Sequence, residues 1–159
     1  MNKFNVKATN VFMQEAIDEA CIGIINKHGG PFGTVIVKDG LVVGRGHNVV
    51  LKANDPTAHG EISAIRDACA NLNTYDLDGC ILYTTGEPCP MCLFACKWAN
   101  IKKVYYGCNI EDNSIIGFRD EEFDSHVSRE DFSAFLECVD RDACIALFEV
   151  YRNMDHEIY

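Results

Sequence analysis

The first part of the chain carries a helical and then an extended pattern of apolar residues. Between residues 8 and 28 apolar side chains recur every three or four positions, which predicts a helix with one buried face. Residues 34–38 have the composition of a buried strand. Asp39-Gly40 is a two-residue hairpin signal, so the strand expected over 41–47 returns antiparallel to the first.

The middle of the chain repeats a helix and strand order. A loop over 51–56 leads into a helix expected over 57–72, then a continuous apolar strand over 80–85. A helix over 90–100 and a strand over 104–108 follow. Because strand–helix–strand units form parallel pairs with a right-handed crossover, we expect these two strands to be parallel.

The last part of the chain is less regular. Residues 109–130 are rich in loop formers, 132–139 is a candidate fifth strand, and Asp140 is expected to cap a final helix that runs toward Tyr159. The whole order predicts a single α/β domain over 1–159, with three α/β/α layers around a mixed five-stranded sheet. Ligand sites in such sheets lie beyond the C-terminal ends of the strands, where helices begin.

The composition is that of an ordinary globular domain, with 48% hydrophobic and 24% charged residues in 159. No apolar run approaches the ~18 residues of a membrane span, and residues 1–5 lack the apolar core of a signal peptide. Nine cysteines could form a disulfide framework, but the chain is long and shows no export signal. We therefore expect reduced thiols, a cytoplasmic protein and no membrane partner.

The formal net charge is −10, from 24 acidic and 14 basic residues. Nucleic-acid binders need a positive face to displace counterions from phosphates. Lys102-Lys103 is the only adjacent basic pair, and no basic stripe is visible. The charge argues against a nucleic-acid partner and favours a small, uncharged ligand.

Two short motifs carry candidate chemistry. His59-Gly60-Glu61 is followed later by Pro88-Cys89-Pro90-Met91-Cys92. One imidazole and two thiolates suit zinc, and three protein ligands leave a fourth position open, as in catalytic sites. Zinc lowers the pKa of water in that position from ~15.7 toward ~7, and Glu61 can move the proton.

The spacing of the motifs is consistent with one site. Cys89 and Cys92 lie three apart and share one face of a helix, at an N-terminus where the macrodipole stabilises thiolates. His59 and Glu61 lie two apart, so they converge only if the chain is still entering a helix. Asp55-Pro56-Thr57 supplies such a start.

The combined pattern, H-x-E followed by P-C-x-x-C, is the signature of the zinc nucleobase deaminases. Two readings without this chemistry remain: a reduced cysteine pair with a surface histidine, and a structural zinc completed by another cysteine.

Three further residues are candidates for binding a flat ring. Phe32 lies among glycines and a proline, where a ring can line a pocket edge or pack in the core. Asn48 can read the edge of a base with its amide, or cap a turn. Trp98, the only tryptophan, can stack on a purine or anchor the core.

The chain resembles the cytidine-deaminase superfamily and, within it, the bacterial guanine deaminases. The matching blocks are Gly30-Pro31-Phe32-Gly33 to Gly40, Asn54 to Arg66 around His59-Gly60-Glu61, Leu77-Asp78 to Cys92, Trp98-Ala99, Gly117-Phe118 and Asp120. The zinc motif identifies the superfamily. Phe32, Trp98, Asp120 and the final Tyr159 point to guanine as the base.

The resemblance implies a reaction and its ligands. His59, Cys89 and Cys92 bind one zinc ion per subunit, and Glu61 shuttles protons. Guanine is hydrolysed to xanthine and ammonia, a step of purine catabolism.

The resemblance also implies how the base is held. Asn48 and Asp120 hydrogen-bond it, and Phe32 and Trp98 sandwich it. The C-terminal segment, about 125–159, crosses to the partner in a swapped homodimer, so that Tyr159 closes over the neighbour's pocket.

Two positions depart from that family. Gly60 stands where alanine is usual, and Thr85-Gly86 stands where Ser-Cys is usual. Both departures bear on the shape of the pocket rather than on its chemistry.

Several other functions share parts of this pattern. A tRNA adenosine deaminase has the same zinc motif but needs a basic groove and salt-sensitive RNA binding. Cytosine or a nucleoside is a second candidate substrate. A zinc-stabilised binding module without turnover would have no use for Glu61.

Overall fold

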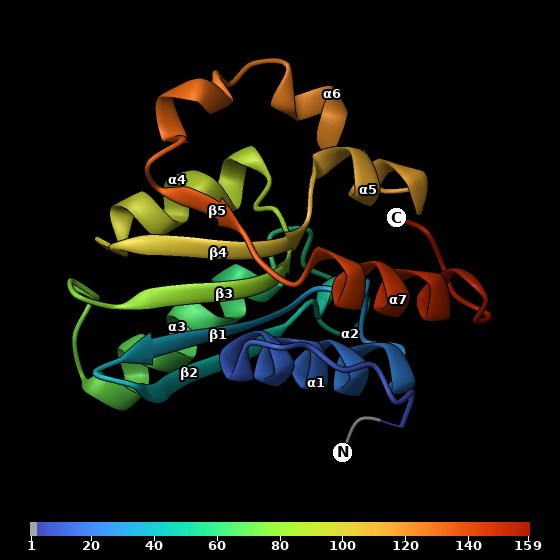
Figure 1. The fold of residues 1–159 in the computed structure, drawn as a ribbon, viewed down its shortest axis with the longest axis horizontal. Helices are drawn as coiled ribbons and strands as arrows, with labels where there is room; N and C mark the ends of the chain where they lie inside the picture. The colour runs from blue at the N-terminus through green and yellow to red at the C-terminus, as the bar shows by residue number, and fades with distance from the viewer. Residues whose placement is uncertain (1–2) are drawn as a thin grey trace.

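The computed structural model describes residues 3–159. Its centre is a five-stranded sheet in the order β2-β1-β3-β4-β5, with helices on both faces (Figure 1). The sequence predicts these three layers and the mixed sheet, and both are confirmed.

The sheet combines antiparallel and parallel pairs. β1 (Gly33–Lys38) lies antiparallel to β2 (Leu41–His47) and to β3 (Ile81–Gly86). β3 is parallel to β4 (Lys103–Cys108), which is parallel to β5 (Leu136–Cys138). The Asp39-Gly40 hairpin and the parallel crossover are therefore as predicted.

Alternation along the strands produces two apolar cores. In β1, Val35 and Val37 face a core that is covered by α1 (Val11–Ile25) and α7 (Arg141–Arg152). Ile36 faces the opposite core.

The second core lies beneath α3 (Gly60–Leu72) and α4 (Pro90–Trp98), which lie behind the sheet in Figure 1. Both helices that follow the predicted ligand motifs therefore cover the same face of the sheet. Their first turns meet at one end of the sheet.

Close contact between α3 and the sheet depends on a glycine in β2. A Cβ atom on Gly46 would lie 2.4 Å from the backbone nitrogen of Ala64 and 2.8 Å from the carbonyl oxygen of Gly60. Only hydrogen fits there, so the start of α3 lies directly on the strand.

The start of α3 differs from the prediction. The helix begins at Gly60 rather than at Thr57, because the Asp55 carboxylate accepts hydrogen bonds from the Thr57 backbone nitrogen (2.8 Å) and hydroxyl (2.7 Å). Because of these hydrogen bonds, residues 57–59 stay outside the helix. The preceding stretch also contains a short helix, α2 (Val50–Ala53), where a loop is predicted.

The segment 109–130, which is expected to be rich in loops, also contains short helices. The segment contains α5 (Ile110–Ile115) and α6 (Asp120–Asp124), and a 3₁₀ turn, η1 (Arg129–Phe132), precedes β5. Asn109 and Asp112 form a capping box that starts α5. The fifth strand is correspondingly shorter than expected.

Asp140 occupies the N-cap position of α7, as predicted, but its side chain bonds elsewhere. It makes no capping bond to α7; its carboxylate accepts hydrogen bonds from the backbone nitrogens of Thr9 and Asn10, both at 2.8 Å. The carboxylate thus joins the start of α7 to the segment before α1.

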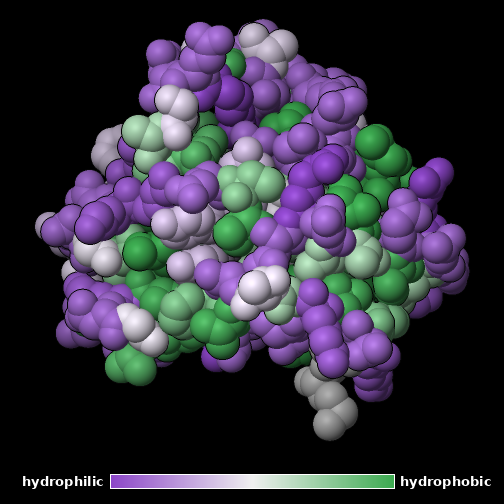
Figure 2. All heavy atoms as spheres, in the orientation of Figure 1, coloured by the Kyte–Doolittle hydropathy of each residue, from purple (hydrophilic) through white to green (hydrophobic). Residues whose placement is uncertain are grey.

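The hydrophilic surface and the free cysteine thiols are what the composition predicts. Hydrophilic residues cover most of the face in Figure 2, interspersed with hydrophobic patches. Within residues 3–159 no helix has the length and apolar character that crossing a membrane requires. All nine cysteines are free thiols.

Candidate active site

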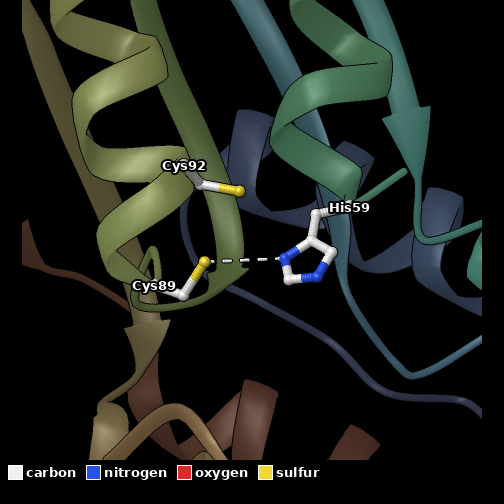
Figure 3. Close-up of side chains that lie close together, drawn as sticks. All are labelled: His59, Cys89 and Cys92. Atoms are coloured by element: carbon white, nitrogen blue, oxygen red, sulfur yellow. Dashed lines mark hydrogen bonds between the residues drawn. The ribbon is translucent and has the colours of Figure 1, made fainter. Parts of the chain in front are cut away.

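The two predicted half-motifs meet in space. The ligand atoms of His59, Cys89 and Cys92 all lie within 4.8 Å of one another, and no other such group occurs among residues 3–159. The Cys89 Sγ lies 3.6 Å from the His59 Nδ1 (Figure 3). Ligand atoms around a tetrahedral zinc ion lie about 3.6 to 3.8 Å apart, so this donor set fits zinc.

The three side chains converge because they lie at the starts of α3 and α4. His59 is the N-cap residue of α3 and Cys89 the N-cap residue of α4, both with extended backbone. Pro90 occupies the first turn of α4, as its fixed φ favours. The structure therefore brings the imidazole and both thiols together for the physical reason that the spacing predicts.

Electrostatics favour a charged ligand set. A hydrogen bond from Cys92, together with His59, lowers the pKa of the Cys89 thiol to about 4 against the effect of burial. Burial opposes the charged form of His59, but the interactions with Cys89 prevail and raise its pKa to about 9. The position therefore favours a thiolate beside a positive charge, which a bound cation would supply.

Glu61 lies in the first turn of α3 and is 5% exposed. Burial raises the pKa of its carboxyl to about 7. A carboxyl near that value can both accept and return a proton at neutral pH.

A small pocket opens beside these groups. Its lining combines the ligand and acidic residues with the predicted base-binding ones: Phe32, Asn48, His59, Glu61, Glu87, Cys89, Phe118, Asp120 and Tyr159. A wider and more apolar mouth continues from it past Val50, Met91 and Phe123.

Asn48 forms one wall of the pocket and is 2% exposed. Its Oδ1 accepts hydrogen bonds from the Val50 backbone nitrogen (3.1 Å) and the Tyr159 hydroxyl (2.7 Å). Within the described residues no hydrogen bond uses its amide nitrogen, which leaves a donor for a ligand. Asn48 therefore caps a turn and also lines the pocket, and its hydrogen bond to a base stays a prediction.

Tyr159 closes the pocket of its own chain in this structure. Its hydroxyl accepts a hydrogen bond from the Gly30 backbone nitrogen at 3.0 Å and donates to Asn48. The exchange of this tail with a partner subunit stays a prediction.

Asp120 begins α6 and lines both the pocket and its mouth. Its carboxylate accepts a hydrogen bond from the Asn113 amide at 2.8 Å. Burial raises its pKa, and the amide hydrogen bond counters that rise.

Aromatic rings form the apolar side of the pocket. Phe32 meets Phe118 edge-on, with ring centroids 4.8 Å apart, and Phe118 meets Tyr159 in the same way at 5.5 Å. Phe118, Glu87 and Asn113 were not singled out by the sequence. The Gly117-Phe118 pair within the resembling blocks was the one available signal.

Trp98 does not belong to this pocket. It ends α4, is 88% exposed and is absent from the lining of the pocket and its mouth. Because it lies two turns beyond Cys92, the helix carries it away from the ligand end. Its exposure contradicts the alternative of a core anchor, and its stacking on the base stays a prediction.

The family that the sequence matches is consistent with the cluster of His59, Cys89 and Cys92. The profile of the cytidine and deoxycytidylate deaminase zinc-binding region matches residues 6–108. The chain belongs to this deaminase family. The matched region contains the complete ligand set and Glu61.

The relatives that resemble this chain include a guanine deaminase and tRNA-specific adenosine deaminases. Guanine deaminase of Bacillus subtilis is 52% identical over 109 residues, which cover 69% of this chain and 70% of that protein. The X-ray structure of the Bacillus subtilis guanine deaminase superposes with a TM-score of 0.72 at 40% identity, over 96% of this chain and 99% of the other. A tRNA-specific adenosine deaminase of Aquifex aeolicus is 49% identical over 76 residues, 48% of this chain and 50% of that protein.

Proposed function

We propose that this deaminase hydrolyses guanine to xanthine and ammonia. The observation that carries the proposal is one small pocket, beside the His–Cys–Cys ligand set, that is lined by the buried carboxyl of Glu61 and a second carboxylate, Asp120. The likeness to a guanine deaminase over more than two thirds of the chain supports the choice of base.

The residues divide the chemistry between them. When bound to His59, Cys89 and Cys92, one zinc ion per chain lowers the pKa of a water toward ~7. Glu61 would accept one proton of the water and pass it to a ring nitrogen, and would then carry the second proton of the same oxygen to the departing amino group. The water oxygen becomes the new carbonyl oxygen at C2 and the amino group leaves as ammonia, so the atoms balance.

Recognition of the base rests on the pocket walls. Asp120 accepts hydrogen bonds from N–H donors on the edge of guanine, a pattern that adenine and cytosine lack. The free amide nitrogen of Asn48 donates to an acceptor on the base. Phe32 and Phe118 exclude water on the apolar side.

We also propose that the chain acts as a homodimer in the cytoplasm. Met91, Phe94 and Trp98 follow one another along α4 at helical spacing with exposures of 39%, 49% and 88%, and such apolar stripes mark interaction surfaces. Exchange of the segment 125–159 would let Tyr159 make the same contacts with the partner's pocket. Reduced cysteines suit a reducing compartment.

The tRNA-specific relatives make RNA the second candidate substrate. A net charge of −10 and the small pocket closed by Tyr159 favour a free base instead. Cytosine is a weaker candidate because it does not present the donor pattern that suits Asp120. A nucleoside is a weaker candidate because the small pocket closed by Tyr159 leaves little room for a ribose.

The direct test uses zinc-loaded protein and free guanine. Xanthine, followed by its ultraviolet spectrum, and ammonia are expected in equal amounts. Protein that holds zinc but leaves guanine unchanged would show that the proposed substrate is wrong.

A further inference from the structure

A buried amide lies behind the pocket and takes no part in the proposed proton transfers. Asn113, on α5, is fully buried. Its Nδ2 donates to the Asp120 Oδ2 at 2.8 Å and to the Glu87 carbonyl oxygen at 3.4 Å. Among residues 3–159 this amide is the only hydrogen-bond donor to the Asp120 carboxylate.

The orientation of the amide follows from its neighbours. The Asp120 carboxylate and the Glu87 carbonyl are both acceptors, so the amide nitrogen must face them. The Asn113 Oδ1 is then turned away and is buried without a hydrogen-bond partner. A buried acceptor without a donor opposes folding, so the contact with Asp120 is retained at a cost in stability.

Gly86 supplies the space that this orientation needs. A Cβ atom at Gly86 would lie 3.0 Å from the Asn113 Oδ1 and 2.8 Å from the Phe32 ring. The missing side chain therefore lets the amide and the ring lie against the same point at the end of β3. Gly86 is also one of the two departures from the family pattern.

We propose that Asn113 is a positioning residue for the base-binding carboxylate, and that Gly86 makes room for it. The amide holds one oxygen of Asp120 and thereby fixes the other toward the pocket. The inference rests on the function proposed above, because that function assigns Asp120 to the base.

The arrangement predicts a defect in binding rather than in proton transfer. In Asn113→Ala the carboxylate loses its only orienting donor, so KM for guanine should rise about tenfold while kcat stays within about threefold. Gly86→Ala keeps the amide but displaces it, and should raise KM in the same direction. Ser114→Ala is the matched control: it removes a side-chain hydrogen bond to Ile110 within the same helix and should leave KM unchanged.

A double-mutant cycle separates positioning from a general structural role. If Asn113 acts through Asp120, Asn113→Ala in an Asp120→Ala background should raise KM no further than Asp120→Ala alone. The inference is overturned if the KM effects multiply, or if Asn113→Ala and Gly86→Ala both keep the wild-type KM.

Should Asn113→Ala lose its zinc or fail to fold, Gly86→Ala in the same cycle with Asp120→Ala decides the question. Wild-type protein that is inert toward guanine instead removes the proposed function, and this inference with it. An active wild type with unaffected variants removes the inference alone.

Discussion

Glu61 joins two properties that a proton-transfer group needs. It is buried, and it lies in the first turn of α3, two residues after the candidate ligand His59. Burial raises its pKa to about 7, so protonated and ionised forms are close in free energy at neutral pH.

The corresponding prediction concerns Glu61→Gln. The amide keeps the shape of the side chain but cannot carry the proton, so kcat should fall by at least ~10²-fold while zinc stays bound. Steady-state kinetics and metal analysis of the same preparation measure both. Near-wild-type turnover in Glu61→Gln would remove the assigned role.

A second prediction concerns the ligands. Cys89→Ala should lower bound zinc from about one ion per chain to a small fraction, and abolish activity, because three ligands become two. Cys69→Ala is the matched control, since this thiol lies outside the ligand cluster, and it should retain zinc and activity. If Cys89→Ala kept a full zinc content, the ligand set would be wrong.

The convergence of the candidate ligands was predictable because each is encoded by short local spacing. His59, Cys89 and Cys92 sit at helix starts that proline, threonine and aspartate signals mark. Asn113 was not predictable, because its function depends on a space left by Gly86, far away in the sequence. Resemblance alone did not indicate that Trp98 lies on the exposed surface of α4, away from the pocket of its own chain.

At the scale of elements, the irregular segment after β4 supplies one side of the pocket. α5 carries Asn113 and α6 carries Asp120, and the two helices pack together. This segment was expected to be loop-rich, since its helices are short and have weak periodicity. The capping box of Asn109 and Asp112 was the readable signal.

Asp112 ties this segment to α7. Its carboxylate is 4% exposed, accepts a hydrogen bond from the Asn109 backbone nitrogen at 2.9 Å and binds the Arg141 guanidinium at 2.6 and 2.8 Å. Because the Arg141 side chain is half exposed, solvent screening weakens the ion pair.

Asp112→Ala should therefore lower the free energy of unfolding by about 2 kcal/mol, since it removes the cap and leaves Arg141 without its partner. Urea denaturation measures the change. Glu111→Ala, an exposed neighbour, should change it by less than about 0.5 kcal/mol. Equal effects for the two variants would contradict the role of Asp112.

At the scale of the whole molecule, the sheet and its layers were predictable because strand alternation and helix periodicity are strong between residues 8 and 108. The helix boundaries were less predictable, because local hydrogen bonds to a side chain, such as that of Asp55, shift the residue at which a helix begins. The position of the tail depends on contacts between distant segments, as in the bond between Tyr159 and Asn48.

Exchange of the tail has a whole-molecule test. If Tyr159 serves the partner's pocket, a mixed dimer of Glu61→Gln and Tyr159→Ala chains contains one complete pocket. Mixing the two variants after partial denaturation should then restore about a quarter of wild-type activity, given random pairing. No recovery, with mixed dimers verified by mass, would show that each tail serves its own chain.

The most direct test of the central claim is a comparison of kcat/KM for zinc-loaded protein with guanine, adenine, cytosine and a tRNA substrate, followed by ammonia release. The account predicts guanine as the preferred substrate by at least about 10²-fold, with activity lost in Glu61→Gln. Preference for adenosine in tRNA, or no ammonia from any free base, would contradict it.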